Sequence, residues 1–150
     1  MRVLELGHAN LFVSDLDRSA EFYGSVLCLP EVARAVLNGR RVAFFSLGVR
    51  HHDLALVEVG HGTEKRDEPQ PGLNHLGLKI GDSVDDLRRG RQHLLSQGIK
   101  PLGYRDHRVC KSIHVQDPDG IRIELYADGD PALWAKDPTA LAFSEPLHLD

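Results

Sequence analysis

The chain has 150 residues, which is enough for one ordinary domain with a sizeable core. Hydrophobic residues make up 41% and charged residues 27%, so the composition excludes a disordered or fibrous protein. The formal net charge of −4 argues against a nucleic-acid or anionic-membrane surface, and no run approaches the roughly 18 apolar residues of a membrane span.

The first part of the chain predicts one strand, one helix and three further strands. Residues 4–13 alternate as a strand does, with His8 on one of its faces. Ser14, followed by an acid three residues on, is the expected N-cap of the helix. The later strands are expected at 32–36, 41–47 and 52–59.

The pattern restarts after a polar stretch rich in glycine and proline, residues 60–73, which is the clearest linker. Residues 74–80 predict a strand, and Ser83 predicts the start of a helix that ends at Gly98. The last strands are expected at 100–104, 112–116 and 121–126.

The two parts form an internal repeat in which His8 aligns with His75. Each half has the order β-α-β-β-β, so we expect an α+β fold made of module 1 (4–59) and module 2 (74–127). Packed together, the two modules would bury apolar surface that each would leave exposed alone. The modules would form a single domain over residues 1–129. The tail, residues 130–150, is expected to pack on this domain or on a partner subunit.

His8, His75 and Glu124 are the candidate metal ligands. Two histidines and one carboxylate on one side of the metal are the set that Fe(II) oxygenases favour, because the remaining positions stay open. If the two halves pair face to face, these three side chains converge. A single histidine on a strand is more often structural, so the prediction depends on the repeat.

On these residues the chain resembles the vicinal oxygen chelate superfamily, which includes glyoxalase I, bleomycin resistance proteins and type I extradiol ring-cleavage dioxygenases. The resemblance covers about residues 4–127. It is carried by Gly7-His8, by Asn74-His75-Leu76 and, most specifically, by Asp117-Pro118-Asp119-Gly120 followed by Ile123-Glu124-Leu125. It implies two paired βαβββ modules that form a metal-binding cup, with His8, His75 and Glu124 as the ligands.

The strand at 52–59 is where two enzyme classes of that superfamily differ. Glyoxalase I enzymes typically add a fourth ligand, a carboxylate, on this strand, where Glu58 lies. Extradiol enzymes use three ligands and have a histidine at the start of the strand, and the segment from His52 to Leu56 resembles theirs. Positions 52 and 58 share a face by strand alternation, so alternation does not decide between them.

We therefore expect an extradiol, catechol-type ring-cleavage dioxygenase that uses Fe(II) or Mn(II), with His52 as the acid and base. The resemblance also implies substrate contacts from His107 and from His114, although His114 stands where the family commonly has a tyrosine. Tyr126 shares a face with Glu124 and is either a substrate contact or part of the core.

Two alternatives stay open. One is a glyoxalase-like lyase or isomerase in which Glu58 is the fourth ligand of Ni(II), Zn(II) or Co(II). The other is a non-catalytic protein of the same fold that binds a small molecule or drug, because a fold does not determine a function.

The expected partners are a small aromatic diol and O2, and the resemblance implies a homodimer or higher homo-oligomer. Cys28 and Cys110 form neither a disulfide framework nor a paired zinc motif. The first residues lack an apolar signal-peptide core, so we expect a cytoplasmic protein. The nine histidines are the unusual count, and they raise the expectation of metal or proton chemistry.

Overall fold

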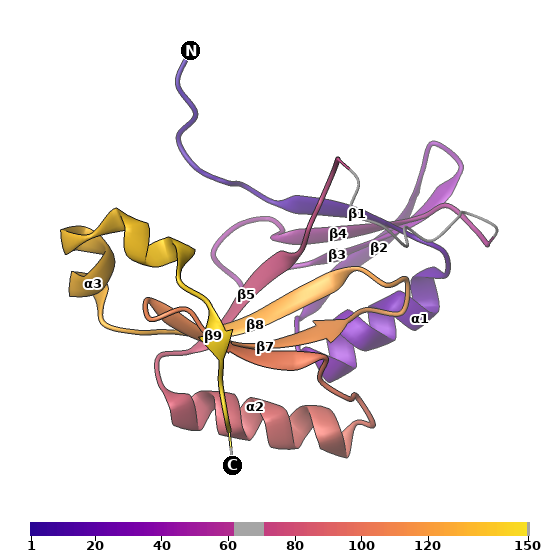
Figure 1. Ribbon diagram of the computed structural model, residues 1–150. Helices are drawn as coiled ribbons and strands as arrows, with labels where there is room; N and C mark the ends of the chain where they lie inside the picture. Colours follow the sequence, from indigo (N-terminus) through magenta and orange to yellow (C-terminus); the bar gives the residue numbers. More distant parts are fainter. Residues whose placement is uncertain (62–70, 150) are drawn as a thin grey trace. The chain divides into compact units, whose positions relative to one another are not determined.

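The computed structural model describes residues 1–61 and 71–149. It contains two compact units, Met1–Asp67 and Glu68–Asp150, each built around one β-sheet with a helix packed against it (Figure 1). This is the predicted α+β architecture with two βαβββ-like sheets. Among the described residues, no helix is both long enough and apolar enough to cross a membrane.

The first unit contains a four-stranded sheet in the order β1-β4-β3-β2. β1 and β4 run parallel, and the other neighbours are antiparallel. The bounds are β1 Ala9–Val13, α1 Leu16–Glu21, a π-helical turn Phe22–Val26, β2 Glu31–Leu37, β3 Arg40–Phe45 and β4 Leu54–Glu58.

The second unit contains a five-stranded sheet in the order β5-β8-β7-β6-β9, in which only β5 and β8 run parallel. The bounds are β5 Leu76–Gly81, α2 Val84–Ser96, β6 Gly103–Asp106, β7 Cys110–Gln116, β8 Arg122–Asp128, α3 Pro131–Lys136, a 3-10 turn Pro138–Ala142 and β9 Glu145–Pro146. The tail thus adds two helical segments to this unit, and it adds the short edge strand β9 to the sheet.

Each unit buries apolar side chains of its sheet and of its helix. Leu16 of α1 is buried, as is Leu56 of β4, and in the second unit Leu87 of α2 is buried, as are Ile113 and Ile123 of the sheet. Full burial of one such side chain stabilises the fold by about 1.5–3 kcal/mol relative to exposure. Because strand side chains alternate, the other face of each sheet is left for polar groups.

The start of α1 differs from the prediction by one residue. Asp15, and not Ser14, is the N-cap, and its Oδ1 accepts a hydrogen bond from the backbone N–H of Arg18 at 3.0 Å. Both residue types cap helices. Asp15 is the cap because its backbone is extended and the helix begins at the next residue, Leu16. The second helix starts as predicted, since Ser83 Oγ accepts from the backbone N–H of Asp86 at 3.2 Å.

Several strands begin later than predicted. β1 begins at Ala9 rather than residue 4, β4 at Leu54 rather than residue 52, and β5 at Leu76 rather than residue 74. The three candidate histidines at these places therefore lie just before a strand and not within it. Most of the predicted linker, residues 62–70, lies outside the described residues.

Candidate metal centre

Glu124 lies on β8, an inner strand between β5 and β7 in the sheet of the second unit. It is in register with Gly77 on β5 and with His114 on β7. Its chain neighbours Ile123 and Leu125 are buried. Side chains alternate along a strand, so Glu124, Gly77 and His114 share the face opposite to that buried pair.

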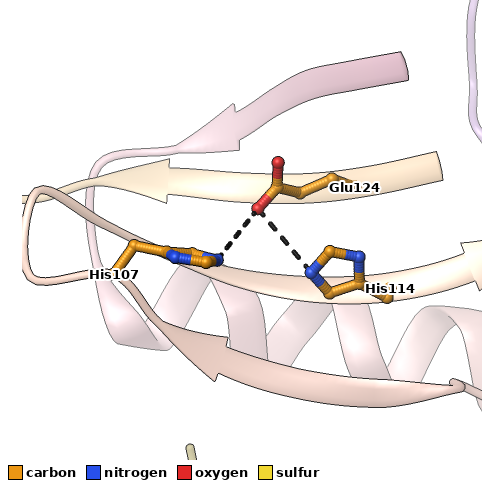
Figure 2. A group of neighbouring side chains, drawn as sticks. All are labelled: His107, His114 and Glu124. Carbon is orange, nitrogen blue, oxygen red and sulfur yellow. Dashed lines mark ion pairs between the residues drawn. The ribbon is translucent and has the colours of Figure 1, made fainter. Parts of the chain in front are cut away.

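Three imidazoles direct Nε2 toward the carboxylate of Glu124. His75 Nε2 lies 3.1 Å from Oε2, and the Nε2 atoms of His107 and His114 lie 3.5 Å and 3.7 Å from Oε1. Figure 2 shows the last two converging on the same carboxylate oxygen. The four side chains are between 14% and 38% exposed, so all of them are partly accessible to solvent.

Hydrogen bonds at the other ring nitrogen orient two of these imidazoles. His75 Nδ1 lies 2.6 Å from Asn74 Oδ1, and His107 Nδ1 lies 2.8 Å from the backbone carbonyl oxygen of Phe143. A carbonyl oxygen only accepts, so in each ring Nδ1 carries the hydrogen and Nε2 keeps its lone pair when the ring is neutral. His114 differs, because its Nε2 also lies 3.2 Å from a hydroxyl group, Ser112 Oγ.

This donor set fits a divalent metal ion. Imidazole nitrogen and carboxylate oxygen bind such ions at about 2.0–2.2 Å, so two ligands of one ion stand about 3.0–3.5 Å apart. The separations of 3.1, 3.5 and 3.7 Å at Glu124 fall in or close to this range. Lone pairs and a carboxylate directed at one point also repel each other unless a cation or a proton lies between them.

Burial affects the ionisation of the groups near Glu124. It lowers the pKa of His114, against the opposing effect of the Glu124 charge. It raises the pKa of the Cys110 thiol to about 11, and it raises the pKa of Tyr126. Cys110 is therefore an unreactive thiol at neutral pH. Tyr126 keeps its proton and can donate a hydrogen bond.

Gly77 keeps space open beside the carboxylate. A Cβ atom at this position would lie 3.7 Å from Tyr126 Cε1 and 4.0 Å from Glu124 Oε2. A larger side chain would therefore fill the space next to both groups.

In the first unit, His8, His51 and His52 form a second group of imidazoles. The His52 ring centroid lies 4.4 Å from that of His8 and 4.4 Å from that of His51, and the Nδ1 atoms of His51 and His52 are 2.5 Å apart. Phe44 packs edge-on against His52 at 5.3 Å. Burial lowers the pKa of His52, as do the nearby His8 and His51, which favours its neutral form.

Glu58 points toward α1. It is in register with Val13 of β1, which is fully buried. Its Oε1 accepts hydrogen bonds from the backbone N–H of Leu16 at 2.9 Å and from Arg41 Nη1 at 3.3 Å. Arg41 also binds Asp17 of α1, and this contact lowers the pKa of that carboxyl. The Glu58 carboxylate therefore binds the start of α1 and a neighbouring strand.

The candidate site residues thus fall into three groups. The second unit brings together His75, His107, His114 and Glu124, with Tyr126 beside them. The first unit brings His8 and His52 together, and it directs Glu58 elsewhere.

Two contacts of the candidate histidines were not predicted. His51, which was not among the candidate residues, is exposed and contacts His52. His107 and His114 were expected at the substrate, and both lie close to Glu124. For His114 a signal was present, because His114 and Glu124 are nearly equidistant from the centre of the 117–120 turn and so must face each other in the hairpin.

The family model for the Glyoxalase/Bleomycin resistance protein/Dioxygenase superfamily matches residues 5–125. Biphenyl-2,3-diol 1,2-dioxygenase 2 of Rhodococcus globerulus is 30% identical over 124 residues, which cover 83% of this chain and 63% of that protein. Catechol-2,3-dioxygenase of Bacillus subtilis strain 168 is 28% identical over 138 residues, which cover 88% of this chain and 44% of that protein. This chain therefore spans less than two thirds of the length of either dioxygenase.

Other similar proteins agree better with this chain in length. Metallothiol transferase FosB of Staphylococcus epidermidis is 29% identical over 130 residues, which cover 84% of this chain and 83% of that protein. Among solved structures, a glyoxylase/bleomycin resistance protein/dioxygenase domain from Frankia sp. EAN1pec has a TM-score of 0.71 at 26% identity. The similarity covers 85% of this chain and 99% of that chain.

Proposed function

Because the chain belongs to the Glyoxalase/Bleomycin resistance protein/Dioxygenase superfamily, we propose that it is a metal-dependent extradiol dioxygenase that opens the ring of a catechol-like diol. The proposed ligands are His8, His75 and Glu124, and the proposed metal is Fe(II), with Mn(II) as the alternative. The two dioxygenases at 30% and 28% identity support this substrate class.

The observation that carries the proposal is that the Glu58 carboxylate is hydrogen-bonded to the start of α1. A glyoxalase-type site would need this carboxylate as its fourth ligand, for Ni(II) or Zn(II), and the carboxylate is already bound by Leu16 N–H and Arg41. Three protein ligands leave the other positions of a six-coordinate ion open. Such a metal would then have room for both oxygens of a diol and for O2.

The residues around the site have the following proposed roles. The metal, when bound, lowers the pKa of the diol hydroxyls and holds the diol in place. His52 takes a hydroxyl proton and later returns it, and its contact with the ring of His8 supports this role. His107 and His114 contact the substrate, and Tyr126 donates a hydrogen bond to it.

Oxygen uptake together with metal analysis tests the proposal. Protein that is purified anaerobically and loaded with Fe(II) should consume O2 with members of a catechol panel and form a yellow ring-fission product. His52→Ala should keep its metal and lose about 100- to 10,000-fold in turnover. If no catechol supports oxygen uptake by the reduced, iron-loaded protein, the dioxygenase proposal is wrong.

A second candidate is metal-dependent thiol transfer. The observation in its favour is the agreement in length with metallothiol transferase FosB, of which the match covers 83%, against 63% and 44% for the dioxygenases. Consumption of a low-molecular-weight thiol by the Mn(II)-loaded protein with a panel of electrophiles, without oxygen uptake, would favour this candidate. Oxygen uptake without thiol loss would favour the dioxygenase.

A further inference from the structure

The carboxyl-terminal segment is attached to the hairpin that carries His107, and it lies outside the residues that the family model matches. β9 pairs antiparallel with β6, with Pro146 opposite Arg105 and Glu145 opposite Asp106. β9 forms the edge of the second sheet (Figure 1). Backbone pairing therefore fixes this segment directly beside His107.

The turn between β6 and β7 also holds the segment. Arg108 has a φ of 62°, a left-handed conformation that is uncommon outside glycine. Its backbone N–H donates to Asp106 Oδ1 at 2.7 Å, and its guanidinium carbon lies 3.7 Å from the ring centroid of Phe143. This distance is well within the range of a cation–π interaction. The turn therefore holds Phe143 next to the residue that precedes Arg108, which is His107.

The carbonyl of Phe143 determines which nitrogen of His107 faces Glu124. This oxygen lies 2.8 Å from Nδ1 and only accepts, so Nδ1 carries the hydrogen. The lone pair of the neutral ring is then on Nε2, which lies 3.5 Å from Glu124 Oε1. Two electron-pair donors at this distance attract an electropositive atom, either a metal cation or the hydroxyl hydrogen of a diol.

We propose that residues 143–146 are a positioning element that fixes His107 as its Nδ1–H tautomer and makes Nε2 an electron-pair donor of the site. Phe143 is a positioning residue that acts through its backbone carbonyl, and Arg108 holds Phe143 in place. The use of this nitrogen by a metal or a diol rests on the proposed function, whereas the tautomer does not.

Nitrogen NMR of the histidine rings tests the tautomer without any metal. In the full, metal-free, 15N-labelled chain at about pH 8, well above the ordinary imidazole pKa of about 6.5, His107 should show protonated Nδ1 and unprotonated Nε2. A chain that ends at Ala142 lacks the carbonyl, and its His107 should shift toward the Nε2–H form. Protonated Nε2 in the full chain would overturn the proposal, as would an unchanged ring in the shorter chain.

A chain that ends at Pro146 is the matched control. It loses the buried Leu149, as the shorter chain does, but it keeps β9 and the carbonyl of Phe143. Its His107 tautomer should stay that of the full chain. Asn74→Ala should change the ring signals of His75 only. If the chain ending at Ala142 does not fold, Arg108→Ala in the full chain should give a mixed His107 tautomer, and an unmixed one would contradict the proposal.

Titration with Zn(II) and the KM for catechol separate the two possible uses of the nitrogen. If a metal uses it, the chain ending at Ala142 should bind Zn(II) about 10- to 100-fold more weakly than the chain ending at Pro146. If the diol uses it, Zn(II) affinity should be equal and the KM for catechol should rise. If the two chains have equal Zn(II) affinity and equal KM for catechol, neither a metal nor a diol uses this nitrogen, and that part of the proposal is overturned. If no variant turns over catechol while the tautomer and Zn(II) differences persist, the proposed dioxygenase activity fails and the positioning role stands.

Discussion

Glu124 and Glu58 are two carboxylates with different surroundings. Glu124 has the Nε2 atoms of His75, His107 and His114 within 3.7 Å, whereas Glu58 accepts from a helix N–H and from Arg41. A carboxylate surrounded by nitrogen lone pairs suits a metal, and a carboxylate at a helix start stabilises the fold.

Metal content should therefore separate these two carboxylates. Glu124→Gln replaces a charged ligand with a neutral amide, so we expect the protein to lose its Fe(II) during gel filtration. Glu58→Gln should keep the same iron content as the unaltered chain. Inductively coupled plasma analysis measures both. Loss of iron from Glu58→Gln would instead support the four-ligand, glyoxalase-type site.

Glu58 should contribute to the stability of the fold. Glu58→Ala removes the acceptor for Leu16 N–H, so we expect a loss of about 1 kcal/mol in the free energy of unfolding, measured in urea. Glu58→Gln keeps an acceptor oxygen and should lose less. An unchanged unfolding midpoint for Glu58→Ala would mean that this contact does not stabilise α1.

The residue types of the candidate site could be proposed from the sequence, whereas most of their contacts could not. The types of the candidate residues were available from the repeat and the motifs. The contact of His107 with the Phe143 carbonyl was not, because it depends on a two-residue strand that no periodicity reveals. The direction of Glu58 was also not available, because the strand begins at Leu54 and alternation cannot be extended back to His52.

The start of α2 should make the stability of the second unit depend on pH. Asp86 Oδ2 accepts from Ser83 Oγ at 2.6 Å and from the N–H of Asp82 at 3.1 Å, and these bonds lower the pKa of Asp86 below 3.8. A carboxyl with a lower pKa in the folded state stabilises that state above the unfolded pKa. This contribution is lost as the pH falls through the folded pKa.

Ser83→Ala removes the hydrogen bond from Ser83 Oγ to Asp86 Oδ2, and it removes the helix cap that Ser83 Oγ provides. We expect it to cost about 1 kcal/mol at neutral pH. It should also reduce the drop in the urea midpoint between about pH 5 and about pH 3. An equal drop in the unaltered chain and in the variant would show that Asp86 does not contribute this pH dependence.

Gly129 should be intolerant of a side chain. A Cβ here would lie 2.7 Å from the carbonyl oxygen of Arg108 and 3.1 Å from that of Val109, and both are backbone atoms of the turn that follows His107. Gly129→Ala should therefore destabilise the protein by about 1–3 kcal/mol. Gly103→Ala is the control, since a Cβ there meets nothing within 4 Å. Equal thermal midpoints for the two variants would contradict this expectation.

The order and type of the elements through β8 follow the sequence prediction, because hydrophobic periodicity and capping residues set them. Their ends were less predictable. Ser14 and Asp15 both suit an N-cap, and only the backbone conformation decides between them. The tail lacked periodicity, and β9 exists because it pairs with β6.

The two units repeat the same strand order, β1-β4-β3-β2 and β5-β8-β7-β6, and the tail adds β9 to the second alone. Asn10 stands two residues after His8, and Gly77 stands two residues after His75. In β4 the partner of Asn10 is Ala55, whereas in β8 the partner of Gly77 is Glu124. The repeat therefore has an alanine in the first unit where the second has its carboxylate, which agrees with a three-ligand site.

Oxygen consumption by the iron-loaded protein tests the account most directly. Fe(II)-loaded, reduced protein is mixed with catechol in an oxygen electrode while the ring-fission product is followed by absorbance. The account predicts one O2 consumed for each ring opened, with Glu124→Gln inactive and Glu58→Gln active. Absence of oxygen uptake at full iron occupancy, or activity that requires Glu58, would contradict it.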